Sequence, residues 1–197
     1  MTAMLDLKPA ARQMASLLQG ITDDQLGAPT PCPEYTLGDL IDHVDGLSQA
    51  FTTAAAKDLG AATSQLPSGD ATRLGDDWRS RIAGQLTALG DAWRDPGAWV
   101  GMTQAGGVDL PAESAGRIAL DELVIHGWDI AHASGQPFDC DPQALSACME
   151  FVSLMSEPGQ EASREGLFGP VVDVPADAPL LDRVIALSGR DPAWTAV

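Results

Sequence analysis

The stretch that decides the fold is ALDELVIHGWD, residues 119–129. It reads as a helix, and Glu122 and His126 are four residues apart within it. At that spacing the two side chains lie on one face, roughly 5–6 Å apart at their Cβ atoms. A carboxylate and an imidazole this close can bind one divalent cation. Ile118 and Ile125 share the face, and a charged group among apolar neighbours is costly unless it is paired or bound to an ion.

A third ligand must come from another segment, and His43 is the strongest candidate among the three histidines of the chain. It lies on a second predicted helix, in line with the apolar stripe of that helix. If the two helices face each other, His43, Glu122 and His126 form a three-ligand site with an open fourth position. Such a site is typical of catalytic rather than structural metal centres. His132 is about 120° from His126 around the helix, so it should face outward or toward the next helix.

Other interpretations of these residues stay open. A Glu–His pair at this spacing is often only a surface contact. Asp129, three residues after His126, either orients that imidazole from outside the ligand set or is a solvent-facing aspartate. Cys32 lies in a proline-rich loop before the second helix. It is either a soft ligand or redox gate for the site, or an inert buried thiol. The sequence assigns no catalytic residue.

The composition indicates a folded, acidic domain. The chain has 197 residues, of which 45% are hydrophobic and 20% charged, and its formal net charge is −17. This charge argues against nucleic acid or an anionic membrane as a partner, because both are bound through Lys and Arg. Three widely spaced cysteines fit a reducing cytoplasm better than a disulfide framework. There is no signal-peptide pattern and no apolar run near the roughly 20 residues of a membrane span, so we expect a cytoplasmic protein.

Apolar periodicity and capping signals predict an all-α fold. We expect a four-helix bundle with a long crossover before the fourth main helix, the crossover being a short hairpin or an extended segment. We expect one domain over residues 1–197, with its core at about 4–155 and a short C-terminal extension at about 156–197. The expected helices cover about 5–18, 36–57, 71–93, 111–134, 141–155 and 180–187.

Several segments together resemble one protein family. Residues 30–44, TPCPEYTLGDLIDHV, are similar to the signature TPC-x-x-[WY]-x-x-x-DL-x-x-H, and residues 122–129 match E-x-x-x-HGWD. These signatures belong to actinobacterial proteins related to the N-terminal domain of mycothiol-dependent maleylpyruvate isomerase. The tail segments FGP (168–170), VPADAP (174–179) and GRDPAW (189–194) resemble the ending of one uncharacterised branch of that family.

The resemblance implies a DinB-like metal-binding four-helix bundle. It implies that a divalent metal, commonly zinc with nickel as an alternative, is bound by His43, Glu122 and His126. The better-known members activate mycothiol, a low-molecular-weight thiol, for isomerisation or S-transfer. In the isomerase a second, C-terminal domain contributes to the active site, whereas this chain has a short tail after its bundle. We therefore expect thiol chemistry at the metal rather than maleylpyruvate isomerisation itself.

Three functions remain in competition at this stage. The first is a metal- and thiol-dependent transferase or isomerase whose partners are mycothiol and a small electrophile. The second is a non-catalytic metal-binding or stress-response module. The third is a hydrolase with water in the open position. The sequence leaves open whether there is turnover and whether the protein is a monomer or a homodimer.

Overall fold

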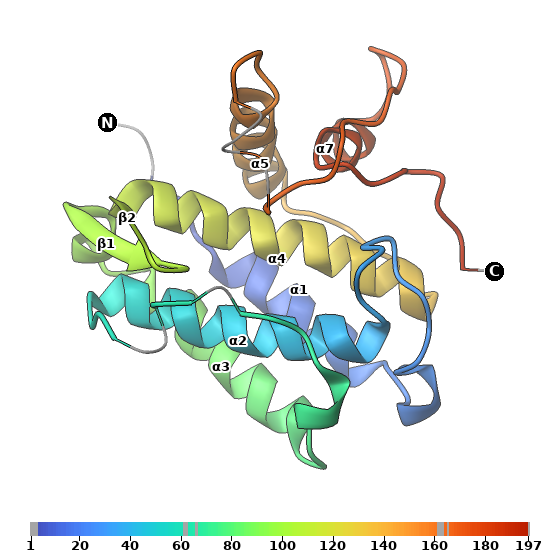
Figure 1. The fold of residues 1–197 in the computed structure, drawn as a ribbon, viewed down its shortest axis with the longest axis horizontal. Helices are drawn as coiled ribbons and strands as arrows, with labels where there is room; N and C mark the ends of the chain where they lie inside the picture. Colours follow the sequence, from blue (N-terminus) through green and yellow to red (C-terminus); the bar gives the residue numbers. More distant parts are fainter. Residues whose placement is uncertain (1–3, 61–62, 66, 161–163, 165, 197) are drawn as a thin grey trace.

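Four long helices form a bundle in the computed structural model, which describes residues 4–60, 63–65, 67–160, 164 and 166–196. They are α1 (Lys8–Gln19), α2 (Leu37–Ala56), α3 (Trp78–Ala92) and α4 (Ala112–Ser134), and their arrangement is visible in Figure 1. α1 and α2 each pack against both α3 and α4. Within the described residues, strands occur only in one two-stranded sheet. The predicted all-α, DinB-like bundle is confirmed.

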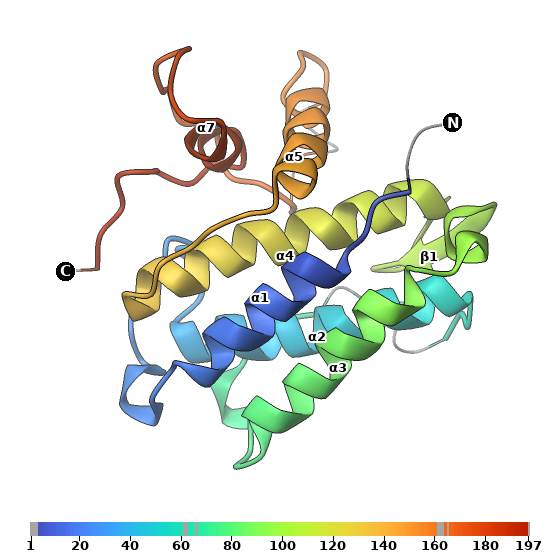
Figure 2. The same cartoon turned by 180° about the vertical axis from the view of Figure 1, so that it is seen from behind.

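Apolar side chains from all four helices fill the centre of the bundle. Figure 2 shows the face on which α1 and α3 lie side by side. Burial of large aliphatic side chains is the main contribution to the stability of such a core, at about 1.5–3 kcal/mol for each one. The largest fully buried side chains are Trp93, Leu7, Met14, Leu18, Leu37, Leu40, Ile41, Ile82, Leu86, Leu89, Leu120 and Ile130.

The helix that carries His43 begins at a complete capping box. Thr36 Oγ1 accepts a hydrogen bond from the backbone N–H of Asp39 (3.3 Å), and Asp39 Oδ2 accepts one from the backbone N–H of Thr36 (3.1 Å). At its other end α2 stops at Lys57, which has a left-handed conformation with φ of 56°. The start predicted at Thr36 is confirmed, and it places His43 in the second turn of the helix.

The third helix is shorter than the sequence predicts. The apolar spacing of Leu74, Trp78 and Ile82 predicts one helix over 71–93. The structure instead has a short 3₁₀ turn, η2 (Ala71–Arg73), and α3 begins only at Trp78. Gly75 lies between them with φ of 68°, which a right-handed helix does not allow. Leu74 is buried although it lies outside the helix, and this is why the apolar spacing was misleading.

The crossover between α3 and α4 is a hairpin that follows a 3₁₀ turn, η3 (Pro96–Trp99). β1 (Met102–Ala105) pairs antiparallel with β2 (Val108–Pro111). The hydroxyl of Thr103 donates a hydrogen bond to the carbonyl of Ala54 (2.7 Å), which ties the hairpin to the end of α2. Of the two forms predicted for this segment, the hairpin is the one observed.

Two further helices, α5 (Pro142–Met155) and α7 (Leu180–Leu187), lie outside the bundle. In Figure 1 both lie above α4, on the side away from α2 and α3. α5 contacts α4, and α7 contacts α5. A 3₁₀ turn, η1 (Asp23–Gln25), follows α1. Residues 161–163, 165 and 197 of the expected C-terminal extension lie outside the described residues. No helix in the described part of the chain combines the length and apolarity needed to cross a bilayer.

Candidate metal centre

His43, Glu122 and His126 come together between two helices of the bundle. One donor atom from each residue lies within 4.8 Å of the other two. Nε2 of His126 is 2.9 Å from Oε2 of Glu122, and the two histidine rings meet edge to face with centroids 5.1 Å apart. α2 supplies His43 and α4 supplies the other two residues. The structure therefore brings all three sequence-predicted residues to one point.

His126 is buried between two carboxylates. Its Nδ1 lies 3.0 Å from Oδ2 of Asp129, and its Nε2 faces Glu122. Burial disfavours the imidazolium, but hydrogen bonds with Asp129 and Glu122 outweigh burial and raise the pKa of His126 to about 9. Burial alone would raise the pKa of Glu122, but the hydrogen bond with His126 and the nearby charges of His126, His43 and Arg190 together outweigh burial and lower that pKa. Asp129 is 0% exposed, so it is not the solvent-facing residue that the sequence left open.

His43 is oriented by a backbone carbonyl. Its Nδ1 lies 2.8 Å from the carbonyl oxygen of Pro67. A ring nitrogen facing a carbonyl donates its hydrogen, so Nε2 keeps the lone pair that a metal requires. Burial, reinforced by the nearby His126, lowers the pKa of His43 to about 4, which favours the neutral imidazole. Sequence reasoning missed Pro67, because no spacing rule relates a loop carbonyl to a helix 24 residues earlier.

Asp42 holds the loop that provides this carbonyl. Its Oδ2 accepts hydrogen bonds from the backbone N–H of Asp70 (3.0 Å) and from Nε of Arg73 (3.0 Å). The loop also lies very close to α2, since a Cβ added at Gly46 would be 2.7 Å from Cβ of Pro67. One helix therefore carries a candidate ligand and also anchors the loop that orients it.

The donor set suits a divalent cation of the zinc type. It consists of two imidazole nitrogens and one carboxylate oxygen, and three protein ligands leave one tetrahedral position open. Both histidines use Nδ1 in a hydrogen bond to an acceptor outside the trio. Metal-binding histidines usually have such a partner, because it fixes the tautomer and the orientation of the ring.

Comparison with known proteins gives the family. The sequence model described as the mycothiol maleylpyruvate isomerase N-terminal domain matches residues 7–131, which contain the whole trio. The chain belongs to this family. Two uncharacterized proteins of Mycobacterium tuberculosis, from strains CDC 1551 / Oshkosh and ATCC 25618 / H37Rv, are each 26% identical to it over 181 residues. The match covers 89% of this chain and 91% of each relative. No solved structure matches the chain.

In this member of the isomerase N-terminal domain family, two other residues raised by the sequence lie outside the trio. Among the described residues, the cluster of potential metal donors does not include Cys32. Burial raises the pKa of its thiol to about 11, which agrees with an inert thiol rather than a ligand. His132 instead stacks on Trp128, with ring centroids 3.9 Å apart.

A buried arginine that sequence reasoning missed lies behind the trio of this family member. Nη2 of Arg190 is 3.2 Å from Oδ2 of Asp129, and the residue is 7% exposed. Arg190 follows α7 and is 61 residues from Asp129, so no sequence pattern could relate the two. Four other arginines are instead paired with carboxylates that do not belong to the trio: Arg73 with Asp42, Arg79 with Asp23, Arg81 with Asp45, and Arg117 with Glu113 and Glu150.

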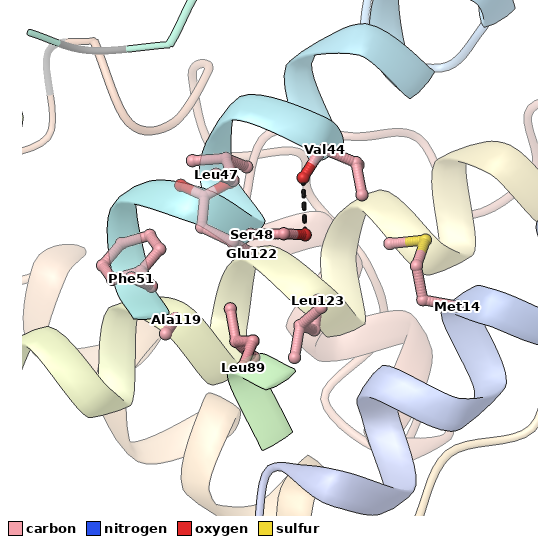
Figure 3. A pocket seen from close by; sticks show the side chains of 9 residues that line it. All are labelled: Met14, Val44, Leu47, Ser48, Phe51, Leu89, Ala119, Glu122 and Leu123. Carbon is pink, nitrogen blue, oxygen red and sulfur yellow. Dashed lines mark hydrogen bonds between the residues drawn. The ribbon is translucent and has the colours of Figure 1, made fainter. Parts of the chain in front are cut away.

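A small apolar cavity inside the bundle has one member of the trio, Glu122, in its wall, as Figure 3 shows. Its volume is about 10 Å³, which is room for about one water molecule and not for an organic substrate. The hydroxyl of Ser48 donates to the carbonyl of Val44 (2.7 Å) in its wall. The lining residues are Met14, Val44, Leu47, Ser48, Phe51, Leu89, Ala119, Glu122 and Leu123.

Proposed function

We propose that this chain binds one divalent metal, with zinc as the first candidate and nickel as the second, and uses mycothiol to transfer or isomerise small electrophiles. The observation that carries the proposal is the convergence of His43, Glu122 and His126 within 4.8 Å. The family supports the choice of thiol, because its name describes a mycothiol maleylpyruvate isomerase. The catalytic part of the proposal goes beyond the family membership of the chain.

Each residue of the site has a defined role in this proposal. His43 and His126 bind the metal through Nε2, and Glu122 binds it through its carboxylate. Pro67 and Asp129 orient the two imidazoles through their Nδ1 atoms. When bound, the cation lowers the pKa of a thiol in the remaining position and so favours the thiolate, which is the nucleophilic form.

The proposal also implies the compartment in which the protein acts. A low-molecular-weight thiol acts as a cofactor in a reducing compartment, and we infer the cytoplasm. Cys32, Cys140 and Cys148 are all free, which suits such a compartment.

The test is metal content followed by turnover. We expect about one equivalent of zinc or nickel in the purified wild-type protein by elemental analysis, as an open three-ligand site would bind, and little in His126→Ala. Conjugation of mycothiol to a fluorescent haloalkyl bimane should then be faster with the metal-loaded protein than without it. His132→Ala is the matched control, because it removes a histidine of the same helix that lies outside the trio.

The outcomes separate the alternatives. Equal metal in wild type and His126→Ala would remove the trio from consideration. Metal binding without thiol conjugation would favour the non-catalytic module. Metal-dependent ester hydrolysis without any effect of mycothiol would favour the hydrolase.

A further inference from the structure

Three side chains form a continuous buried chain behind the candidate metal centre. Oδ2 of Asp129 lies 3.0 Å from Nδ1 of His126 and accepts a hydrogen bond from Nη2 of Arg190 (3.2 Å). Asp129, His126 and Arg190 are 0%, 6% and 7% exposed. One oxygen atom therefore joins a candidate ligand to a cation from the C-terminal segment.

Among the described residues, only one of the two carboxylate oxygens of Asp129 takes part in hydrogen bonds. Its second oxygen, Oδ1, is buried and has no hydrogen-bond partner among the described residues. A buried carboxylate is strongly destabilising unless its charge is compensated. Arg190 provides the charge opposite to that of Asp129 and also a directional donor. Without Arg190, the carboxylate would have no guanidinium to set the position of Oδ2.

The end of α7 aims Arg190 at this point. The backbone N–H of Arg190 donates to the carbonyl of Ile185 (3.1 Å), and that of Gly189 donates to Ala186 (3.0 Å). This is the Schellman pattern, which needs a left-handed residue, and Gly189 has φ of 85°. Nη1 of Arg190 donates to the carbonyl of Ser188 (3.0 Å). The guanidinium is thus held in place by its own segment as well as by Asp129 on α4.

We propose that Arg190 is a positioning residue that fixes Asp129 against His126 and thereby increases the affinity of the trio for a divalent metal. The inference rests on the proposed metal site and extends it to the C-terminal segment, which lies beyond the residues matched by the family. Loss of the outer partner of a metal-binding histidine typically weakens metal binding 10- to 100-fold. We expect a loss of about that size in Arg190→Met.

The experiment measures zinc affinity by competition with a chromophoric chelator at constant pH and uses the full chain. Arg164→Met is the matched control. Arg164 ties the same C-terminal segment by donating to the carbonyls of Gly169 (3.0 Å from Nε) and Leu187 (2.5 Å from Nη2). Among the described residues, its hydrogen bonds do not involve Asp129. The visible spectrum of the cobalt(II)-loaded protein provides a second readout, because it reports ligand geometry and not overall stability.

The expected results are specific to the chain of contacts. Arg190→Met and Asp129→Asn should each weaken zinc binding and change the cobalt spectrum, whereas Arg164→Met should do neither. In the Asp129→Asn background, Arg190→Met should cause no further loss, because the link is already broken. Arg190→Lys keeps the charge and should recover part of the affinity.

Two results would overturn the inference. One is Arg190→Met binding zinc as tightly as wild type while Asp129→Asn does not. The other is a further loss of zinc affinity when Arg190→Met is added to Asp129→Asn. This comparison remains possible if Arg190→Met alone does not fold, because the Asp129→Asn background has no buried carboxylate to leave unpaired. A wild-type protein without zinc affinity would refute the proposed metal site as well, so the two failures are distinguishable.

Discussion

Proton competition at His126 should set the pH dependence of metal binding. A metal must displace the proton from any imidazole that binds it. The two candidate histidines differ strongly, since the pKa of His126 is raised to about 9 and that of His43 is lowered to about 4. Between pH 5 and pH 8 only His126 therefore carries a proton that the metal must remove.

The magnitude follows from this difference. One displaced proton changes the apparent dissociation constant about tenfold per pH unit, or about 1.36 kcal/mol. Metal affinity should therefore rise about 100-fold from pH 6 to pH 8 and level off above pH 9. Two ordinary histidines, each with a pKa of about 6.5, would behave differently. Their affinity would hardly change above pH 8 and would change more than tenfold per unit below pH 6.

The assay is zinc titration against a chelator of known pH dependence, at half-unit steps from pH 5.5 to 9. Calorimetry at pH 7 in two buffers with different ionisation enthalpies should give about one proton released per metal bound. In Asp129→Asn the levelling-off should move to lower pH, because one of the hydrogen bonds that raise the pKa of His126 is weakened. An affinity that stays constant between pH 7 and pH 8.5 would refute the reasoning.

Two further predictions concern the elements that position His43. Thr36→Ala should lower the free energy of unfolding by about 1 kcal/mol, measured by urea denaturation, because it removes the N-cap of α2; an unchanged midpoint would mean that the cap contributes nothing. Gly46→Ala should weaken zinc binding, because the new Cβ would lie 2.7 Å from Pro67 and displace the loop carbonyl from His43. Gly84→Ala, with nothing within 4 Å of its added Cβ, should leave zinc affinity as it is, and equal affinities in the two glycine variants would contradict the argument.

The sequence predicts helices well where local chemistry decides them. The capping box at Thr36 and Asp39 set the start of α2, and Gly135, with φ of 69°, ends α4 where the apolar pattern stops. The predicted start of α3 is wrong because a residue outside the helix is buried there. Leu74 is buried from a loop, so apolar spacing continued across Gly75 although the helix did not.

The residues of the candidate site also differ in whether the sequence predicts them. Glu122 and His126 were predictable as neighbours because the helix repeat fixes their spacing. His43 was predictable because it lies in line with the apolar face of its own helix. Pro67 and Arg190 were not predictable, since their positions depend on a loop and on the packing of α7 against α5. Sequence patterns thus identify the potential ligands, and tertiary structure is needed to find the groups that orient them.

The charges around the trio give a physical reason for a thiolate partner in the proposed function. Two neutral imidazoles, the Glu122 carboxylate and a divalent cation would carry a net charge of about +1. Behind them, the opposite charges of Asp129 and Arg190 cancel. Burial raises the pKa of the neighbouring Asp121 well above its usual range, which favours its neutral form and adds little negative charge. A thiolate in the open position would make the partly buried centre neutral, whereas a neutral thiol or water would leave it charged, and an uncompensated charge is costly where water is largely excluded. The same reasoning applies to Arg190 in a chain with a formal net charge of −17: its positive charge offsets that of Asp129, so Asp129 would not cancel the charge of a cation bound by the trio.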